Sequence, residues 1–153
     1  MRKTSVGLAV LVALAATLGV VAAARPASGT QRVSITHNGD SFVLTPTSSG
    51  AIRTDRGTVT FCCWTSRHVV RAGKTLVVDD PRMTLVGAHG TLRLRNRIAW
   101  VDVPGGWSVF TGTWKVVGGT GAYAGLTGHG QAAGVKTTGG SDRAQFFGFL
   151  APK

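Results

Sequence analysis

Glutamate is absent from this chain of 153 residues, and its six acidic residues are all aspartates. Paired carboxylates for acid–base catalysis could come only from Asp79 and Asp80, and neighbouring residues in an Asp-Asp-Pro turn point apart. The four histidines are scattered, and no H-E-x-x-H or Gly-x-Ser-x-Gly motif occurs. Sustained helical periodicity with capping residues is missing as well. These absences favour an all-β protein without a recognisable catalytic set.

Cysteine is also scarce, since Cys62 and Cys63 are the only two and stand side by side. A disulfide between neighbours closes a small strained ring. On a strand the two side chains would face opposite sides of the sheet, so we expect one buried and one exposed thiol. A vicinal redox switch and an intermolecular bridge are the alternatives. No histidine or second cysteine pair stands at ligand spacing, so neither a metal nor another cofactor is expected.

Long hydrophobic runs are confined to the N-terminus. Met1-Arg2-Lys3 precedes an apolar run over Val6–Ala24, which ends in three alanines. A basic head, an apolar middle and a small-residue end are typical of a secretory signal peptide, here residues 1–24. A retained membrane anchor is the alternative, because the run is nearly long enough to span a bilayer. We therefore expect a secreted, extracellular protein with a lead-in at residues 25–31 and one domain over residues 32–153.

Charge of one sign dominates, with 17 basic residues against six acidic ones. Without Arg2 and Lys3, the formal charge of the remaining chain is about +9. Such a surface attracts polyanions, such as cell-wall phosphates, acidic polysaccharides or nucleic acid, through screened electrostatics. No recognised nucleic-acid-binding motif is present, so sequence-specific nucleic-acid recognition is not expected.

Residues 32–153 alternate between apolar and polar side chains in short segments separated by glycine- and proline-rich turns. This pattern predicts antiparallel strands in a barrel or a sandwich. One strand, 58–65, is expected to continue over 67–71 past a bulge. The expected strands span residues 32–37, 41–45, 58–65, 75–78, 83–86, 91–103, 107–117, 131–136 and 142–150.

The segment Trp107–Gly130 is the central hairpin of the predicted fold. Its sequence predicts a long strand, a glycine-dense turn and the start of a return strand. Tyr123 and Leu126 are the bulky apolar residues of the turn, and we expect them to plug one end of a barrel. A nucleotide-binding loop is the alternative for its Gly-Gly-Thr-Gly sequence. However, no P-loop Lys-Ser/Thr and no helical pattern follow it.

The spacing W-K-V-V-G-G-T-G-A-Y-A-G-L-T-G from Trp114 to Gly128 resembles the signature of the allene oxide cyclase and dirigent-protein superfamily. The aromatic end Ala144–Leu150 is similar to the closing strand of that family, and the likeness covers about residues 91–150. It implies a single antiparallel eight-stranded barrel, often a homotrimer, whose lumen can hold an apolar ligand. The cyclase glutamate has no counterpart in this chain, and the dirigent pocket cannot be matched by motif. The resemblance therefore implies the scaffold without the site.

Candidate ligand-binding residues fall into two groups. Arg93, Arg95 and Arg97 share one face of an expected strand, with side chains about 7 Å apart. They form either a solvated outer face or a strip that binds carboxylates or phosphates. The second group consists of aromatic and ionisable residues near the expected lumen and turn: Trp100, Asp102, Trp114, Tyr123 and His129. A surface position is the alternative for His129.

These observations predict a secreted, non-catalytic barrel that binds a small apolar ligand in its lumen or an anionic polymer on its surface. The alternative is a cyclase-like or dirigent-like enzyme that steers a reactive intermediate by shape. That alternative requires a ligand-sized lumen and a buried ionisable pair, such as Asp102 with an arginine. The third hypothesis is a purely structural envelope protein, whose copies assemble through sheet edges or through an exposed cysteine.

Overall fold

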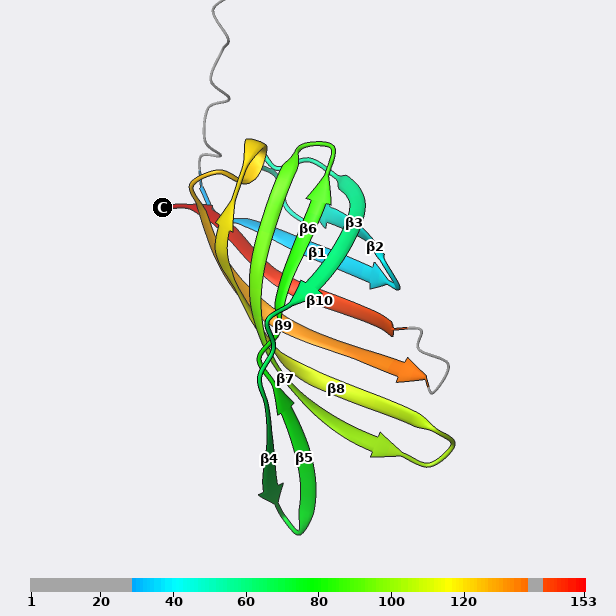
Figure 1. Cartoon of the computed structure of the whole chain (residues 1–153). Helices are drawn as coiled ribbons and strands as arrows, with labels where there is room; N and C mark the ends of the chain where they lie inside the picture. The colour runs from blue at the N-terminus through cyan, green and yellow to red at the C-terminus, as the bar shows by residue number, and fades with distance from the viewer. Residues whose placement is uncertain (1–28, 138–141) are drawn as a thin grey trace, which may run out of the picture.

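The structure, a computed structural model, describes residues 29–137 and 142–153, and the described chain is almost entirely β-strand (Figure 1). A single short 3-10 helix, η1, interrupts the strands described. The elements are β1 (Gln31–Asn38), β2 (Ser41–Pro46), β3 (Asp55–Cys62), β4 (Ser66–Arg71), β5 (Lys74–Asp79), β6 (Arg82–Gly87), β7 (Gly90–Val103), β8 (Trp107–Gly119), η1 (Gly121–Tyr123), β9 (Leu126–Thr137) and β10 (Asp142–Pro152).

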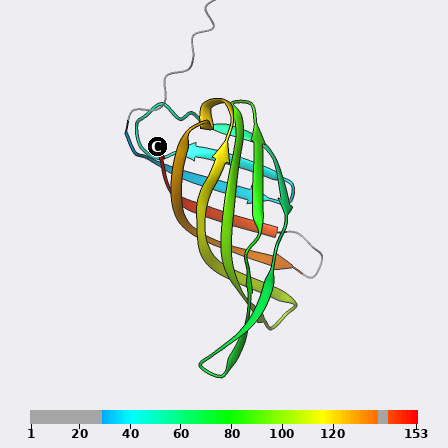
Figure 2. The same ribbon diagram turned by 60° about the vertical axis from the view of Figure 1, so that its left-hand side comes forward.

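Eight of these strands close into an antiparallel barrel. Their order is β7-β6-β3-β2-β1-β10-β9-β8, and β8 pairs back with β7 over its whole length. Figures 1 and 2 show the long strands β7, β8 and β9 curving around one side of the barrel, with the shorter strands on the other. Closure removes the free edges that an open sheet would expose. The predicted all-β, eight-stranded antiparallel barrel is thus confirmed.

The hairpin β4–β5 departs from this barrel. The ladder between β3 and β6 stops where Cys62 pairs with Arg82, and β5 then pairs with β7 through residues 98–100. The hairpin therefore extends the wall beside β7 and projects beyond the barrel (Figure 1). The expectation that residues 67–71 continue the preceding strand is wrong. The backbone of Cys63 turns to a φ of 56°, which takes the chain out of the strand.

Inside the barrel, large aromatic side chains lie opposite glycines. Trp114 pairs with Gly130, which in turn pairs with Gly148. A Cβ atom at Gly130 or Gly148 would lie 2.6 or 2.5 Å from the indole ring of Trp114. The two glycines therefore make the room that this side chain fills, and Trp114 is only 2 % exposed. The sequence predicted that the crowded glycines let neighbouring backbones approach closely. In the structure, two of them also leave space for the indole ring of Trp114.

One end of the barrel is closed by η1 and the start of β9. Tyr123 and Leu126 are both buried there, as expected of a plug. The Tyr123 hydroxyl donates to Oδ2 of Asp55 at 2.8 Å, across 68 residues of sequence. The amides of Arg56, Ala88 and His89 also donate to this buried carboxylate. We call this region the closed end.

The Asp55 carboxylate is charged at neutral pH despite its burial. Burial alone would raise the pKa of Asp55, but the hydroxyl of Tyr123 and the three amide donors outweigh it and hold the pKa below its ordinary value. Burial and the adjacent carboxylate raise the pKa of Tyr123 far above its usual range, so the phenol stays a hydrogen-bond donor. The closed end is thus held by a charge-assisted network.

Two other predictions concern the cysteine pair and the N-terminal segment. Cys62 and Cys63 are both exposed and unbonded, so the expected buried thiol is wrong. The strand ends at Cys62, and the left-handed backbone of Cys63 breaks the alternation of faces. The expected signal peptide at residues 1–24 lies outside the described residues, as does most of the lead-in. Gln31, its last residue, already belongs to β1.

Candidate functional site

A cavity of about 450 Å3 lies at the opposite end of the barrel, which we call the open end. The β1–β2 and β7–β8 turns lie there, and the hairpin β4–β5 diverges from the barrel beside it (Figures 1 and 2). This volume is within the range of small-molecule sites. The cavity is lined by His37, Phe61, Trp64, Val77, Asp79, Pro81, Asn96, Ile98, Trp100, Asp102, Ser108, Phe110, Lys136, Asp142 and Phe146.

Aromatic rings form much of the cavity wall. Trp100 and Phe110, from neighbouring strands β7 and β8, lie 4.6 Å apart between ring centroids. On the other side, Phe61 contacts His37 at 5.4 Å and Trp64 at 6.4 Å, both edge to face. Trp64 lies in the β3–β4 connection and is 57 % exposed, so it forms the rim. Such a wall favours a ligand with an apolar or aromatic body.

Four polar side-chain atoms of this wall are buried without a hydrogen-bond partner among the described residues: His37 Nε2, Asn96 Oδ1, Trp100 Nε1 and Asp142 Oδ1. The described chain has no other buried side-chain nitrogen or oxygen in this condition. Asn96 and His37 are only 2 % and 3 % exposed. An unpaired buried polar group costs about 1–3 kcal/mol. Because all four unpaired atoms belong to residues that line one cavity, this cavity is a candidate functional site where stability is sacrificed.

The charges around the cavity are mainly negative. Asp79, Asp102 and Asp142 line it together with Lys136. Two of these carboxylates accept hydroxyl hydrogen bonds of 2.6 Å, Asp79 from Ser66 and Asp102 from Ser108. The third, Asp142, keeps its unpaired Oδ1. Acceptor oxygens thus outnumber donors on this wall, which favours a ligand that brings hydrogen-bond donors.

His37 is neutral within this setting. Burial lowers the pKa of His37 below its ordinary value of 6.5, and this effect outweighs a backbone hydrogen bond with Gly39 and the charges of Asp142 and Asp40. The protonated ring would be poorly solvated among Phe61 and its neighbours. At neutral pH the cavity therefore holds an uncharged imidazole.

The structure divides the predicted site residues into three places. Trp100 and Asp102 line the cavity. Trp114 and Tyr123 are core residues, at mid-barrel and at the closed end. Trp114 Nε1 donates to the carbonyl of Gln131 at 3.1 Å, so its polar atom is already used. The remaining candidates, Arg93, Arg95, Arg97 and His129, are exposed on the outer wall. The eight candidates therefore do not form one site.

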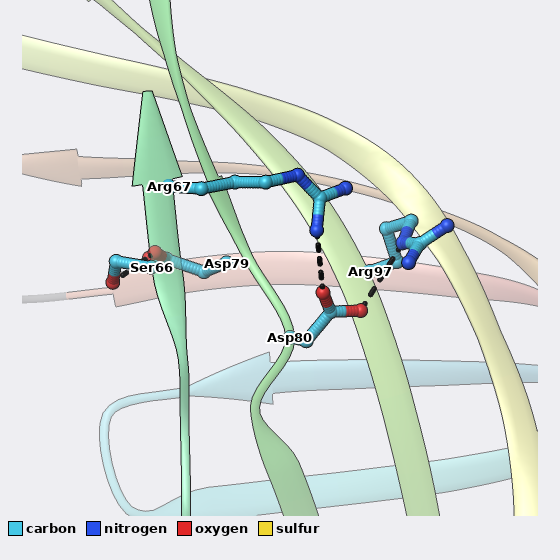
Figure 3. Close-up of polar contacts among 5 residues, drawn as sticks. All are labelled: Ser66, Arg67, Asp79, Asp80 and Arg97. Atoms are coloured by element: carbon cyan, nitrogen blue, oxygen red, sulfur yellow. Dashed lines mark hydrogen bonds and ion pairs between the residues drawn. The ribbon is translucent and has the colours of Figure 1, made fainter. Parts of the chain in front are cut away.

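Arg97 has a partner that the sequence did not indicate. Its Nε donates to Asp80 Oδ1 at 3.1 Å, and Arg67 of the hairpin reaches Oδ2 of the same carboxylate at 3.3 Å (Figure 3). Asp80 is largely buried between the two guanidinium groups, while both arginines are more than half exposed. This bridge ties β4 to the barrel wall. An exposed pair of this kind stabilises by less than about 1 kcal/mol.

Several cavity residues were not among the predicted candidates, notably His37, Phe61, Phe110, Asp142 and Phe146. One signal was available for a further member, Asn96. It interrupts the inward-facing series of Leu92, Leu94, Ile98 and Trp100, where a polar side chain is out of place. The others could not be found, because their proximity depends on strand register.

Comparisons with protein-family models, with curated proteins and with solved structures find no match. The resemblance to allene oxide cyclases and dirigent proteins therefore stays a prediction. Within the described residues, no helix is long and apolar enough to cross a membrane. Nor does that part of the chain bring three His, Cys, Asp or Glu side chains together as a metal site.

Proposed function

We propose that this protein is a secreted, non-catalytic barrel that binds a small, largely apolar ligand in the open-end cavity. One observation carries the proposal, namely that four buried polar atoms without partners surround the same aromatic cavity. A bound ligand that satisfied these atoms would recover the free energy lost by leaving them unpaired. The cavity is also preformed, which limits the entropy lost on binding.

The chemistry of the wall narrows the ligand class. The carboxylate of Asp142 and the amide oxygen of Asn96 need donors, whereas the indole N–H of Trp100 needs an acceptor. The surplus of aspartates over Lys136 disfavours a ligand that carries a carboxylate. An aromatic or aliphatic body with an amine or hydroxyl group fits best, because a cation can also lie against the rings of Trp100 and Trp64.

Three probes of similar size test this preference: phenethylamine, phenethyl alcohol and phenylacetate. Tryptophan fluorescence reports binding, since Trp64 and Trp100 border the cavity. We expect the amine to bind most tightly, the alcohol less tightly and the carboxylate least. Binding of none of the three, in fluorescence and in native mass spectrometry, would count against the proposal, and tightest binding of phenylacetate would contradict the assigned ligand class.

A matched pair of variants locates the binding site. Trp100→Phe removes the unpaired indole N–H, from which an alcohol oxygen can accept a hydrogen bond but a protonated amine cannot. This variant should therefore weaken binding of phenethyl alcohol about three- to tenfold. Trp107→Phe makes the same change on an exposed residue outside the cavity lining and should leave the affinity unchanged. Equal effects of the two variants would place the binding elsewhere.

The enzyme alternative gains no support from the residues it named. Asp102 accepts the hydroxyl of Ser108 in an exposed hydrogen bond. In the described part of the chain, the arginine–aspartate bridges all involve Asp80. The buried pair of Asp102 with an arginine is therefore a wrong expectation. Its physical reason is that Asp102 lies at the open end of β7, beyond the three arginines of that strand.

A further inference from the structure

A row of basic side chains crosses the outer wall of the barrel at right angles to the strands. Arg82 of β6 pairs directly with Arg95 of β7, Arg95 pairs with Lys115 of β8, and Lys115 pairs with His129 of β9. All four side chains are exposed. Because neighbouring strands lie about 4.8 Å apart, three permanent cations stand within about 10 Å along this row.

This arrangement is unfavourable for the protein alone. Like charges directly opposite on neighbouring strands destabilise a sheet. The salt bridges of the described residues both use Asp80, which takes Arg67 and Arg97. Arg82, Arg95 and Lys115 therefore have no carboxylate partner among these residues. An external anion would relieve their mutual repulsion.

The surface beside the row is concave. Two hollows in the outer wall meet at Arg95 and Lys115, which line both of them. One hollow includes Arg82 and Arg93, and the other includes His129 and Thr113. A chain-like anion lying along the hollows would contact several cations at once, where a single small anion would contact one or two.

We propose that this row, from Arg82 to His129, binds a linear phosphate polymer without nucleobases. A guanidinium fork matches the oxygens of a phosphate group bidentately. Binding of single-stranded nucleic acid usually adds aromatic platforms on which bases stack. Beyond His129 the row passes through a single phenyl ring, that of Phe149, whose centroid lies 6.3 Å from the His129 ring. It then reaches Arg32 of β1, which pairs with Phe149 and lies 5.8 Å over its ring. The site therefore recognises backbone charge.

The test uses medium-chain inorganic polyphosphate as the probe and compares two double variants of equal charge change. Arg95→Gln with Lys115→Gln removes a cross-strand cation pair from the row. Arg71→Gln with Lys74→Gln removes a cross-strand cation pair at the tip of the hairpin β4–β5. We expect affinity to fall at least about tenfold for the row variant and less than about twofold for the hairpin variant, because only the row variant loses phosphate contacts.

Calorimetric titration at several salt concentrations supplies the measurement, and circular dichroism checks that both variants fold. Affinity of the wild type should fall linearly with the logarithm of salt concentration, with a slope that flattens in the row variant. Equal weakening by both variants, or no binding to the wild type, would overturn the proposal. Equally tight binding of poly-glutamate or of oligo-thymidine would overturn the choice of a base-free phosphate polymer. The row lies on the outside, so none of these outcomes bears on the cavity.

Discussion

The two ends of the barrel treat buried polar groups in opposite ways. At the closed end, the carboxylate of Asp55 receives four donors from three parts of the chain. The side chain of Gln31 likewise donates to the carbonyls of Ser48 and Ile52 and accepts the amide of Ile52. At the open end, four buried polar atoms have no partner among the described residues. The buried polar groups of the closed end thus stabilise the fold, whereas those of the open end leave hydrogen-bonding capacity unused, on which the proposed ligand site depends.

The position of the hairpin β4–β5 explains the difference. At the closed end, β3 and β6 pair continuously, so the wall is complete and the interior is packed. At the open end, the chain leaves the barrel after Cys62 and returns at Arg82. The wall there is completed by β5 along β7 alone, and the side chains of Trp64 and Val77 border a space instead of filling a core.

The largest expected effect is at Asp55. Asp55→Ala leaves the Tyr123 hydroxyl and three backbone amides without their acceptor, which should lower the free energy of unfolding by about 3 kcal/mol or more. Asp102→Ala is the matched open-end change and should cost less than about 0.5 kcal/mol, because Asp102 accepts only one hydroxyl, in an exposed hydrogen bond. Urea denaturation followed by fluorescence measures both. Similar losses for the two variants would contradict the contrast between the ends.

A smaller effect, of opposite sign, is expected at Asn96. Asn96→Leu replaces a buried amide, whose Oδ1 has no partner, with an apolar side chain of similar volume and should raise the free energy of unfolding by about 1 kcal/mol. The same change should weaken binding of phenethylamine, since it removes an acceptor from the cavity. A destabilised variant would mean that the amide, which also donates weakly to the sulfur of Met83 at 3.8 Å, contributes to the fold.

The smallest effects concern pH, and the two ends should respond in different ranges. Because the pKa of His37 is lowered from 6.5, the unfolded chain binds its proton first, and stability falls as the pH drops below about 6.5 through the folded-state pKa. The pKa of Asp55 in the folded protein is lowered from its ordinary value of 3.8, so the stability that Asp55 contributes is lost only as the pH falls below about 3.8. Melting temperatures between about pH 8 and pH 3 should therefore show two separate declines.

Single variants assign these two declines. His37→Gln should flatten the decline near pH 6.5 and leave the acidic one unchanged. A decline that persists in His37→Gln would assign it to another group.

The alternating pattern of the sequence was enough to predict several features of the fold. It placed most strands, set the three arginines of β7 against Leu92 and Leu94 on opposite faces, and assigned Tyr123 and Leu126 to a barrel end. Side-chain alternation is a local property of an extended chain, and it survives whatever the partner strands are. The faces of Cys62 and Cys63 were predicted wrongly because the backbone at Cys63 leaves the extended conformation.

Only the tertiary structure decided which residues meet. Strand order and register bring His37, Asn96 and Asp142 to one cavity, although their separations in sequence carry no common pattern. Register also sets Arg82, Arg95 and Lys115 side by side across three strands, where the sequence showed only the arginines along one. Pairing between strands is a long-range property that depends on where hairpins turn and where β4–β5 leaves the barrel. The sequence by itself therefore determined the faces of each strand, and the closed sheet determined the sites.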